Sequence, residues 1–526
     1  MPDIPIVEPG NGSTGRRLAA AAMIVVAATA ASRVFGYVRE IATAAYFGAG
    51  AEMSAFDVAF LVPATVQIII AQAALSAALI PVFAGLLEKG KRQEAWLVAR
   101  TVFTLVIMVM GAIVVLCILF APEIMPLFAP GYRDDPVMMA EIVRMTRLLF
   151  PTVILLALTG IVASVLNSFE HFALPAIAPI FWNIIILAFV VFGHDRLGID
   201  ALAWGILLGT VVQLAMQVPA LRGRGGSLGW SLAWRNPNVR KVGALLLPVS
   251  VSLGLINLNG VVDVQFASFL GTGGVAAMTF AFRLYQLPES LFAIAVGTVL
   301  FPTLSRIAAR EDRDAFRSTL TRGIRVIFFL LIPASAFMLA LSQPIVRLAY
   351  EHGEFTPENT DLVASALFFF AIGSAFSGGS TLLTRGFFSL RRPWLPTAAA
   401  VGNLAVNAFL NWLFIKPFGL GGIPLSTSVV SAVTFIVLLV LMRRELGRVD
   451  GRAIIRAAVS VALVSAVAVT AAYFSWKELD AWLGSGLVQQ VVSLCVAFAV
   501  ALGIFTFIAA AIRMPELQLV RKLRRG

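Results

Sequence analysis

The chain has 526 residues, of which 59% are apolar and only 13% are charged. A soluble domain is about 25% charged, so the composition excludes an ordinary soluble protein and indicates a polytopic membrane protein. The net charge of +12 is spread between apolar stretches, so we expect no nucleic-acid partner. The few cysteines and histidines are scattered, which argues against a disulfide scaffold and a metal site. These residues are Cys117, Cys495, His171, His194 and His352.

The apolar stretches, taken in chain order, predict fourteen membrane spans, since a span takes about 20 residues. They lie near residues 19–47, 55–83, 98–121, 142–167, 172–193, 200–221, 242–270, 275–304, 324–346, 362–384, 394–415, 420–442, 454–475 and 486–512. Arg16 and Arg17 precede the Ala-rich first stretch in the manner of a signal sequence. Cleavage there would remove part of a span, so we expect the stretch to be retained.

The basic residues between the spans indicate an orientation. With the N-terminus inside, the inner connections hold 29 Lys and Arg residues and the outer connections hold five. Short cytoplasmic loops are enriched in Lys and Arg. We therefore expect an even number of spans and a multi-pass protein with both termini in the cytoplasm.

An internal repeat runs along the chain at an offset of about 224 residues. Corresponding residues are Gly48 and Gly271, Gly50 and Gly273, Pro63 and Pro288, and Asn183 and Asn407. The repeat predicts two six-helix bundles of the same orientation, related by a pseudo-two-fold axis along the membrane normal. Such halves usually enclose a site at their interface and work by alternating access.

The expected domain organisation follows from this repeat. It comprises a cytoplasmic tail (1–18), an N-terminal six-helix bundle (19–221), a basic cytoplasmic linker (222–241), a C-terminal six-helix bundle (242–442), two additional transmembrane helices (443–512) and a basic cytoplasmic tail (513–526). The two additional helices have no counterpart in the first half, so we interpret them as an appendage.

Arg33, Arg39 and Arg283 lie inside predicted spans, where each costs about 2.5–3.5 kcal/mol on insertion scales. In an unbroken helix the side chains of Arg33 and Arg39 point in directions about 120° apart around the axis. A bend at Gly36 would bring these directions closer together. The arginines either snorkel to an interface, pair with carboxylates or line one cationic cavity. The carboxylates in question are Glu40, Asp57 and Glu289. We favour a cationic cavity shared by the three arginines.

A second polar set combines Asp263 with Asn403, Asn407, Asn411 and Thr427. The three asparagines are spaced by four residues and therefore lie on one face of a helix. A carboxylate with amide and hydroxyl oxygens suits a hard cation such as Na⁺, and it also suits a proton relay. Hydrogen bonds that only hold helices together are an equally good interpretation.

Several motifs, taken in order, resemble the MurJ (MviN) lipid II flippase family of the multidrug/oligosaccharidyl-lipid/polysaccharide exporter superfamily. They are SRVFGYVRE at 32–40, YFGAG at 46–50, AFDVAFLVP at 55–63, FAPGY at 128–132, FASFLGTG at 266–273, FRLYQLPESLFAIAVGTVLFPTLSR at 282–306 and YEHGEFT at 350–356. The resemblance extends over nearly the whole chain, and a count of fourteen spans is typical of that family.

The resemblance implies a transporter rather than an enzyme. It implies that undecaprenyl-pyrophosphate-linked disaccharide-pentapeptide, lipid II, moves from the inner to the outer leaflet of the bacterial cytoplasmic membrane during peptidoglycan assembly. Arg33, Arg39 and Arg283 match the family's cavity arginines. Asp263, Asn407, Asn411 and Thr427 match a Na⁺ site of some members.

Two departures from the family pattern concern candidate site residues. The acidic residue usual before the AFxVAF stretch is Ser54 here, and Asp57 lies three residues on, on the same helical face. We therefore include Asp57 among the substrate-binding residues. Position 411, acidic in some members, is Asn411, and this departure argues against Na⁺ binding. Na⁺ and H⁺ both stay open as the coupling ion.

Other functions remain as alternatives. A flippase for another lipid-linked oligosaccharide fits the same arginines, whereas a drug exporter should prefer carboxylates in its cavity. A membrane glycosyltransferase needs a large outer loop, and the longest here, 122–141 and 347–361, are short. We expect no cofactor beyond the coupling ion, a monomer in the lipid bilayer, and cell-wall synthesis proteins as partners.

Overall fold

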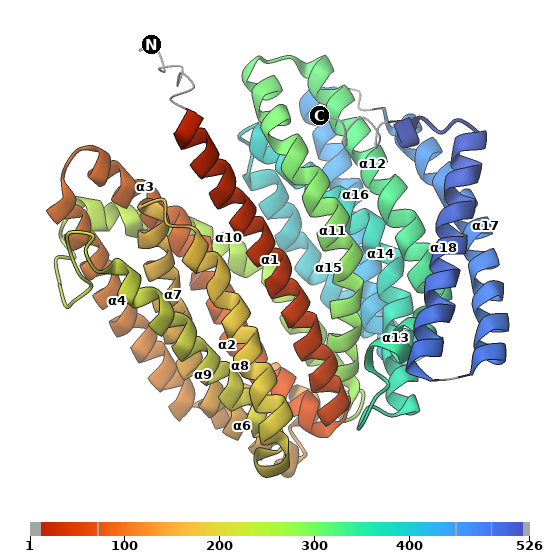
Figure 1. The fold of residues 1–526 in the computed structure, drawn as a ribbon, viewed down its shortest axis with the longest axis horizontal. Helices are drawn as coiled ribbons and strands as arrows, with labels where there is room; N and C mark the ends of the chain where they lie inside the picture. The colour runs from red at the N-terminus through yellow and green to blue at the C-terminus, as the bar shows by residue number, and fades with distance from the viewer. Residues whose placement is uncertain (1–11, 71–72, 448–449, 485, 519–526) are drawn as a thin grey trace. The chain divides into compact units, whose positions relative to one another are not determined.

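The structure, a computed structural model, describes residues 12–70, 73–447, 450–484 and 486–518. These residues form helices and connecting turns, and none of them lies in a β-strand. The ends of the predicted tails 1–18 and 513–526 lie outside the described residues. The predicted all-α fold is confirmed (Figure 1).

Ten helices cover the first part of the chain. They are α1 Gly12–Phe47, α2 Ala51–Ile70, α3 Ala73–Glu88, α4 Arg92–Leu119, α5 Ala121–Phe128, α6 Pro136–Leu149, α7 Pro151–Ser168, α8 Ala173–Leu197, α9 Asp200–Gln217 and α10 Pro237–Ala267.

Eight more helices cover the rest of the described chain, with short 3₁₀ turns at Pro130–Tyr132, Val218–Leu221 and Gly419–Gly421. They are α11 Gly274–Ala309, α12 Arg313–Ala340, α13 Ser342–Tyr350, α14 Pro357–Ser389, α15 Trp394–Phe418, α16 Gly422–Leu446, α17 Gly451–Leu483 and α18 Leu487–Ala511.

Each predicted span coincides with one or more helices, but several boundaries were wrong. The span predicted at 324–346 belongs to α12, which begins at Arg313, and to the separate helix α13. The span predicted at 55–83 comprises α2 and α3. Hydropathy detects only the lipid-embedded part of a helix, and polar turns extend helices beyond it.

Local signals set the helix ends. The side chain of Asp135 accepts hydrogen bonds from the backbone N–H groups of Val137 and Met138 at 3.1 and 3.0 Å, so it caps α6. Asp312 caps α12 in the same way. Side-chain caps of this kind satisfy the first N–H groups of a helix, which have no partner within it.

Ten helical stretches among the described residues are long and apolar enough to cross a membrane. One of them, Trp394–Leu446, holds both α15 and α16. The chain is therefore a multi-pass integral membrane protein.

The repeat predicted from the sequence recurs in the helix bounds. Helix α4 and helix α12 begin and end 221 residues apart, and so do α8 and α15. The spacing is slightly shorter than the 224 residues of the sequence motifs. Both parts of the chain thus follow the same order of helices.

The described chain forms two compact units. Unit 1 comprises residues up to 47, 58–127 and 135–257, and unit 2 comprises 48–57, 128–134 and the chain from 258 onward. The predicted linker 222–241 therefore lies within unit 1. Residues 48–57 and 128–134, from the first half of the sequence, belong to unit 2.

Unit 1 contains an aromatic cluster at one end of α3, α4 and α7. Phe83 packs edge-on against Trp96 and Phe169, with ring centroids 5.9 and 5.7 Å apart. Phe83 and Trp96 are buried. The cluster fixes the start of α4 against its neighbours.

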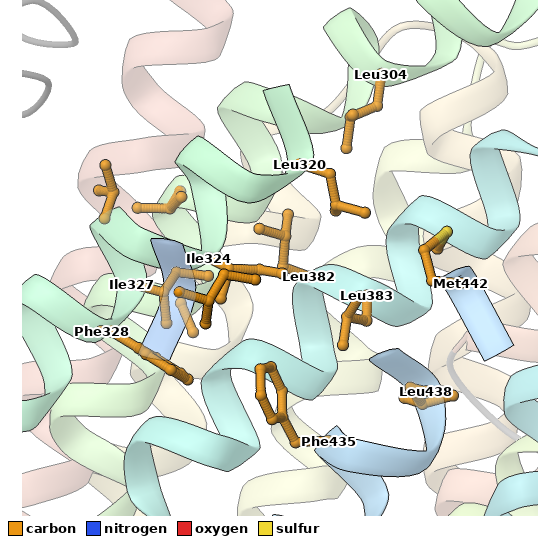
Figure 2. Packing of buried hydrophobic residues seen from close by; sticks show 14 of the residues in the cluster. Leu304, Leu320, Ile324, Ile327, Phe328, Leu382, Leu383, Phe435, Leu438 and Met442 are labelled. Carbon is orange, nitrogen blue, oxygen red and sulfur yellow. The ribbon is translucent and has the colours of Figure 1, made fainter. Parts of the chain in front are cut away.

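Unit 2 has a large aliphatic and aromatic core between α11, α12, α14 and α16. Figure 2 shows Ile324 and Phe328 of α12 facing Leu382 of α14 and Phe435 of α16. Helices α17 and α18 pack on α12, where Phe329 contacts Phe505 at a ring-centroid distance of 5.2 Å. The two appended helices are thus part of unit 2.

The motif segments 48–57 and 128–134 pack onto the turn between α10 and α11 within unit 2. The backbone N–H of Gly131 donates to the hydroxyl of Ser268 at 2.9 Å. A Cβ at Gly131 would lie 2.4 Å from the Ser268 carbonyl group, so only glycine fits without a shift. The Tyr132 hydroxyl donates to the Gly271 carbonyl at 3.1 Å. Burial raises the pKa of Tyr132 to about 12, so this donor stays protonated at physiological pH.

Candidate functional site

Helix α1 carries the first two predicted site arginines. It is one continuous helix through Gly36 (Figure 1), so Arg33 and Arg39 point in directions about 120° apart. Arg33 is exposed, whereas the side chain of Arg39 is only 13% exposed. The two arginines of α1 therefore have different surroundings.

The guanidinium of Arg39 contacts Glu40 and Trp182 within unit 1. Its Nη2 lies 3.3 Å from Oε2 of Glu40, whose side chain is 6% exposed. The guanidinium carbon lies 5.2 Å from the ring centroid of Trp182 in α8. The Trp182 indole donates to the Thr210 hydroxyl at 3.1 Å, which fixes the ring. A cation over a fixed indole beside a carboxylate is held in one orientation.

Contacts between α1 and α8 hold this arrangement. The amide of Asn183 donates to the backbone carbonyl of Pro179 at 3.0 Å and lies 3.4 Å from that of Ser32. Asn183 is buried. It therefore joins α8 to the segment of α1 that precedes Arg33.

Arg283 and Asp57 both lie in unit 2. Arg283 is half-buried on α11, and Asp57 is buried on α2. Glu289, which the sequence offered as a partner for the arginines, accepts a hydrogen bond from Ser377 of α14 at 2.6 Å. The cavity shared by the three arginines stays a prediction.

Four of the five residues in the second predicted polar set come together within unit 2. Asp263 of α10 is 8% exposed, and each of its carboxylate oxygens accepts a hydrogen bond from another helix. The Asn411 amide donates to Oδ1 at 2.8 Å, and the Thr427 hydroxyl donates to Oδ2 at 3.1 Å. The same Asn411 nitrogen lies 3.3 Å from Oδ1 of Asn407. Three helices thus converge on one buried carboxylate.

Oxygen atoms dominate this cluster. Oδ1 of Asn411 is buried and has no hydrogen-bond partner in the part of the chain that the structure describes. Both Asp263 oxygens, Oδ1 of Asn407 and the Thr427 hydroxyl are ligands of the kind that a hard cation takes. Rotation of the Asn411 amide, whose nitrogen faces Asp263 and Asn407 here, would add its oxygen to this set. No group of three or more His, Cys, Asp and Glu side chains among the described residues is suited to a metal ion, so a cation here would rely on one carboxylate.

Asn403 is separate from this cluster. Asn403 lies one turn before Asn407 in α15, and its amide donates to the hydroxyl of Thr434 at 2.7 Å. A spacing of four residues places three asparagines on one face of a helix, but the partner helix decides which of them meet Asp263. The contacts of Asn403 are those of a residue that joins α15 to α16.

Trp182 and Ser377 are two neighbours of candidate site residues that the sequence did not single out. They contact Arg39 and Glu289 from α8 and α14. An aromatic residue or a serine in a membrane helix is too common to be a signal alone. Only the helix contacts reveal these two side chains.

Comparisons with known proteins give a consistent result. A family model described as "Lipid II flippase MurJ" matches residues 43–493. The chain is 30% identical over 510 residues to a probable lipid II flippase MurJ of Rhizobium meliloti (strain 1021), covering 95% of each chain. It is 29% identical to a lipid II flippase MurJ of Burkholderia cenocepacia, covering 79% of this chain and 82% of that one.

Solved structures show the same fold. A structure of lipid II flippase MurJ in an inward closed conformation superposes with a TM-score of 0.78 at 23% identity, covering 93% of this chain and 99% of that one. An inward-facing multidrug resistance transporter of the MATE family and MOP superfamily gives a TM-score of 0.68 at 13% identity, covering 81% and 98%. The matched range and the identity over nearly the full length show that this chain belongs to the lipid II flippase MurJ family.

Proposed function

We propose that this chain moves lipid II from the inner to the outer leaflet of the bacterial cytoplasmic membrane. The observation that carries the proposal is the match to the lipid II flippase MurJ family over residues 43–493. The relative from Rhizobium meliloti, which aligns over 95% of its length, is named for the same role. The protein is then a transporter that breaks no covalent bond.

The chemistry of the head group explains why arginines would be needed. A bare pyrophosphate does not cross about 30 Å of hydrocarbon, because transfer of an isolated ion from water costs tens of kcal/mol. A guanidinium is permanently charged and matches phosphate oxygens with planar pairs of N–H donors. The proposed binding residues are Arg33, Arg39, Arg283 and Asp57.

Arg39 is the residue on which this mechanism depends most. Its low exposure and its contacts with Glu40 and Trp182 support an oriented cation inside a membrane helix. In our proposal the pyrophosphate binds this cation while the two halves alternate between inward and outward access. The polyprenyl chain stays in lipid throughout.

A depletion experiment tests the function. A bacterial strain whose own flippase can be depleted expresses this chain, and a membrane-impermeant reagent measures lipid II on the outer leaflet. We expect outer-leaflet lipid II to persist with the native chain and to fall at least tenfold with Arg39→Glu, since the charge reversal repels the pyrophosphate. Arg196→Glu, the same charge change at an exposed end of α8, should keep native labelling.

Three outcomes decide the result. Equal outer-leaflet labelling with and without this chain would refute the flippase assignment. Native labelling with Arg39→Glu, at equal amounts of inserted protein, would remove Arg39 from the mechanism. Rescue of another lipid-linked sugar, with lipid II still confined to the inner leaflet, would assign the chain to that alternative substrate.

A further inference from the structure

A connecting segment, residues 224–236, lies along the first turns of α4 in unit 1 (Figure 1). We call it the strap. The side chain of Arg100 donates to the Ser227 carbonyl at 2.6 Å, and the backbone N–H of Ser231 donates to the Thr104 hydroxyl at 3.0 Å. As the strap advances from Ser227 to Ser231, its contacts move one turn further into α4. The strap therefore runs toward the membrane centre.

The chain then returns to the start of α4. The Asn238 amide, at the beginning of α10, donates to Oε1 of Glu94 at 2.7 Å. Helix α4 has 28 residues and is thus about 42 Å long, whereas the hydrocarbon core is about 30 Å thick. An upright α4 therefore extends about 12 Å beyond that core, and the strap contacts α4 from Trp96 to Thr104, over a length of about 12 Å. With this overhang at the start of α4, the strap begins at the depth of the lipid head groups, and its contact with Thr104 reaches the edge of the hydrocarbon.

The strap is fixed in this position. Trp96 is buried, and its indole donates to the Arg224 carbonyl at 3.2 Å. A Cβ at Gly226 would lie 2.3 Å from the Trp96 ring, so only glycine permits this close approach. Side chains of α4 thus supply the hydrogen bonds that irregular backbone needs near lipid.

The outer face of the strap is apolar. Trp230, Leu232 and Trp234 are 75%, 60% and 53% exposed. The guanidinium of Arg235 stacks on the Trp234 ring at 4.9 Å. Exposed tryptophans with adjacent basic residues are typical of the membrane–water interface.

A cationic cavity lies at the start of the strap. Its volume is about 1000 Å³, and its lining includes Lys91, Arg92, Glu94, Arg100 and Gly225. Three cations and one carboxylate give the cavity a net positive charge. The carboxylate is already engaged by Lys91, at 3.5 Å, and by the Asn238 amide. Arg92 is exposed and stacks on the Phe169 ring at 5.8 Å.

We propose that the strap and this cavity form a binding site for an anionic glycerophospholipid of the membrane. The phosphate occupies the cavity beside Lys91 and Arg92, and the acyl chains lie along Trp230, Leu232 and Trp234. Cations at head-group depth and apolar side chains further in match the two ends of such a lipid. A free phosphate would explain the cations but not the neighbouring exposed tryptophans.

Fluorescence quenching tests the site without any transport assay. The full chain is reconstituted in phosphatidylcholine vesicles that contain increasing fractions of phosphatidylglycerol brominated on its acyl chains. The protein holds nine tryptophans, so the fluorescence of the strap must be separated from that of the others. It is obtained by subtracting the fluorescence of the variant Trp230→Phe/Trp234→Phe from that of the native chain. We expect brominated phosphatidylglycerol to quench this signal at a lower lipid fraction than brominated phosphatidylcholine does.

Charge variants locate the phosphate. Lys91→Gln and Arg92→Gln each remove one cation. Each change should raise the fraction of phosphatidylglycerol that gives half of the maximal quenching about fivefold. The single change Lys91→Gln is informative even if the double variant Lys91→Gln/Arg92→Gln misfolds, because the Lys91 side chain is 61% exposed. Lys89→Gln/Lys241→Gln removes two exposed cations outside the cavity lining and should leave the preference intact.

Other results would overturn the site. Equal quenching by both brominated lipids would show that the strap only rests in the bilayer. A full preference for phosphatidylglycerol in Lys91→Gln and in the double variant would place the anion elsewhere. Loss of the preference in inorganic phosphate, but not in chloride of equal ionic strength, would assign the cavity to free phosphate.

Discussion

At the scale of single residues, the Asp263 cluster shows how one buried carboxylate organises its neighbours. Asn411 uses one amide nitrogen for both Asp263 and Asn407, and its own oxygen has no hydrogen-bond partner among the described residues. A buried acceptor without a partner costs about 1–3 kcal/mol. Rotation of this amide would turn its oxygen toward the carboxylate, and a cation between them would then satisfy both. We therefore propose Na⁺ as the ion bound by Asp263, Asn407, Asn411 and Thr427.

This proposal predicts a sodium-dependent stability. At a Na⁺ concentration of about 100 times the dissociation constant, binding should stabilise the folded protein by about 2.7 kcal/mol. NaCl should then raise the thermal unfolding midpoint of the native chain above its value in choline chloride. Asp263→Asn should abolish the difference, because it removes the carboxylate charge.

Asn403→Ala is the matched control for the sodium prediction. It removes an amide on the same helix face that bonds Thr434 rather than Asp263, so its response to sodium should equal that of the native chain. Equal midpoints of the native chain in the two salts would exclude a Na⁺ site. In that case the cluster would serve only to join α10, α15 and α16.

At the scale of helices, two ion pairs attach α17 and the segment that follows α18, which holds Glu516, to the rest of unit 2. Nε and Nη2 of Arg325 in α12 donate to Oε1 of Glu516 at 2.8 and 2.5 Å. Arg347 of α13 forms a two-point ion pair with Asp480 of α17. These contacts add to the aromatic packing between α12 and α18. The appended helices therefore have specific attachments as well as apolar ones.

Removal of the Glu516 carboxylate, which pairs with Arg325, should lower the stability of the protein measurably. Glu516 is 3% exposed and Arg325 is 21% exposed, so Glu516→Ala leaves a largely buried guanidinium without its carboxylate. We expect a loss of about 2 kcal/mol in the free energy of unfolding, below the 3–5 kcal/mol of a fully buried pair because water reaches the arginine. Unfolding of the purified protein, followed by circular dichroism, measures this loss.

A double substitution separates the ion pair from packing. Arg325→Met/Glu516→Met removes both charges and should be closer to the native stability than Glu516→Ala is. Glu478→Ala, at an exposed position of α17, should have almost no effect. If the double change costs as much as the single one, the charges contribute nothing and packing alone holds α18.

At the scale of the whole molecule, the distribution of Lys and Arg predicts how the chain lies in the membrane. Basic connections should face the cytoplasm, and the strap with Lys91 and Arg92 belongs to that side. The ten apolar stretches establish repeated crossing of the membrane. The side on which each connection lies is the part that we propose.

Cysteine labelling measures this orientation. The two native cysteines, Cys117 and Cys495, are replaced by serine, and single cysteines are introduced at Lys89 and Lys477, which are both exposed. A membrane-impermeant thiol reagent should label position 477 in intact spheroplasts and position 89 only after the membrane is opened. The reverse pattern would contradict the proposed orientation and place the strap at the outer leaflet.

The sequence by itself determined the all-α membrane fold, the approximate spans, the repeat and the family. Each of these depends on residue composition and spacing along the chain, which hydrophobic burial in lipid translates directly into helices. A polar set of Asp263, Asn403, Asn407, Asn411 and Thr427 was also predicted from polar residues inside the spans, and the family resemblance pointed to four of them, without Asn403. The structure brings these four residues together.

Only the tertiary structure decided which helices meet. It separated Asn403 from Asp263, placed Trp182 against Arg39, and packed residues 48–57 and 128–134 into unit 2. It also turned the predicted linker into a strap fixed on α4. These contacts join residues that are far apart in the sequence, and the direction of each side chain depends on the helix opposite. Composition and spacing report neither the partner helix nor its rotation, so contacts of this kind cannot be derived from them.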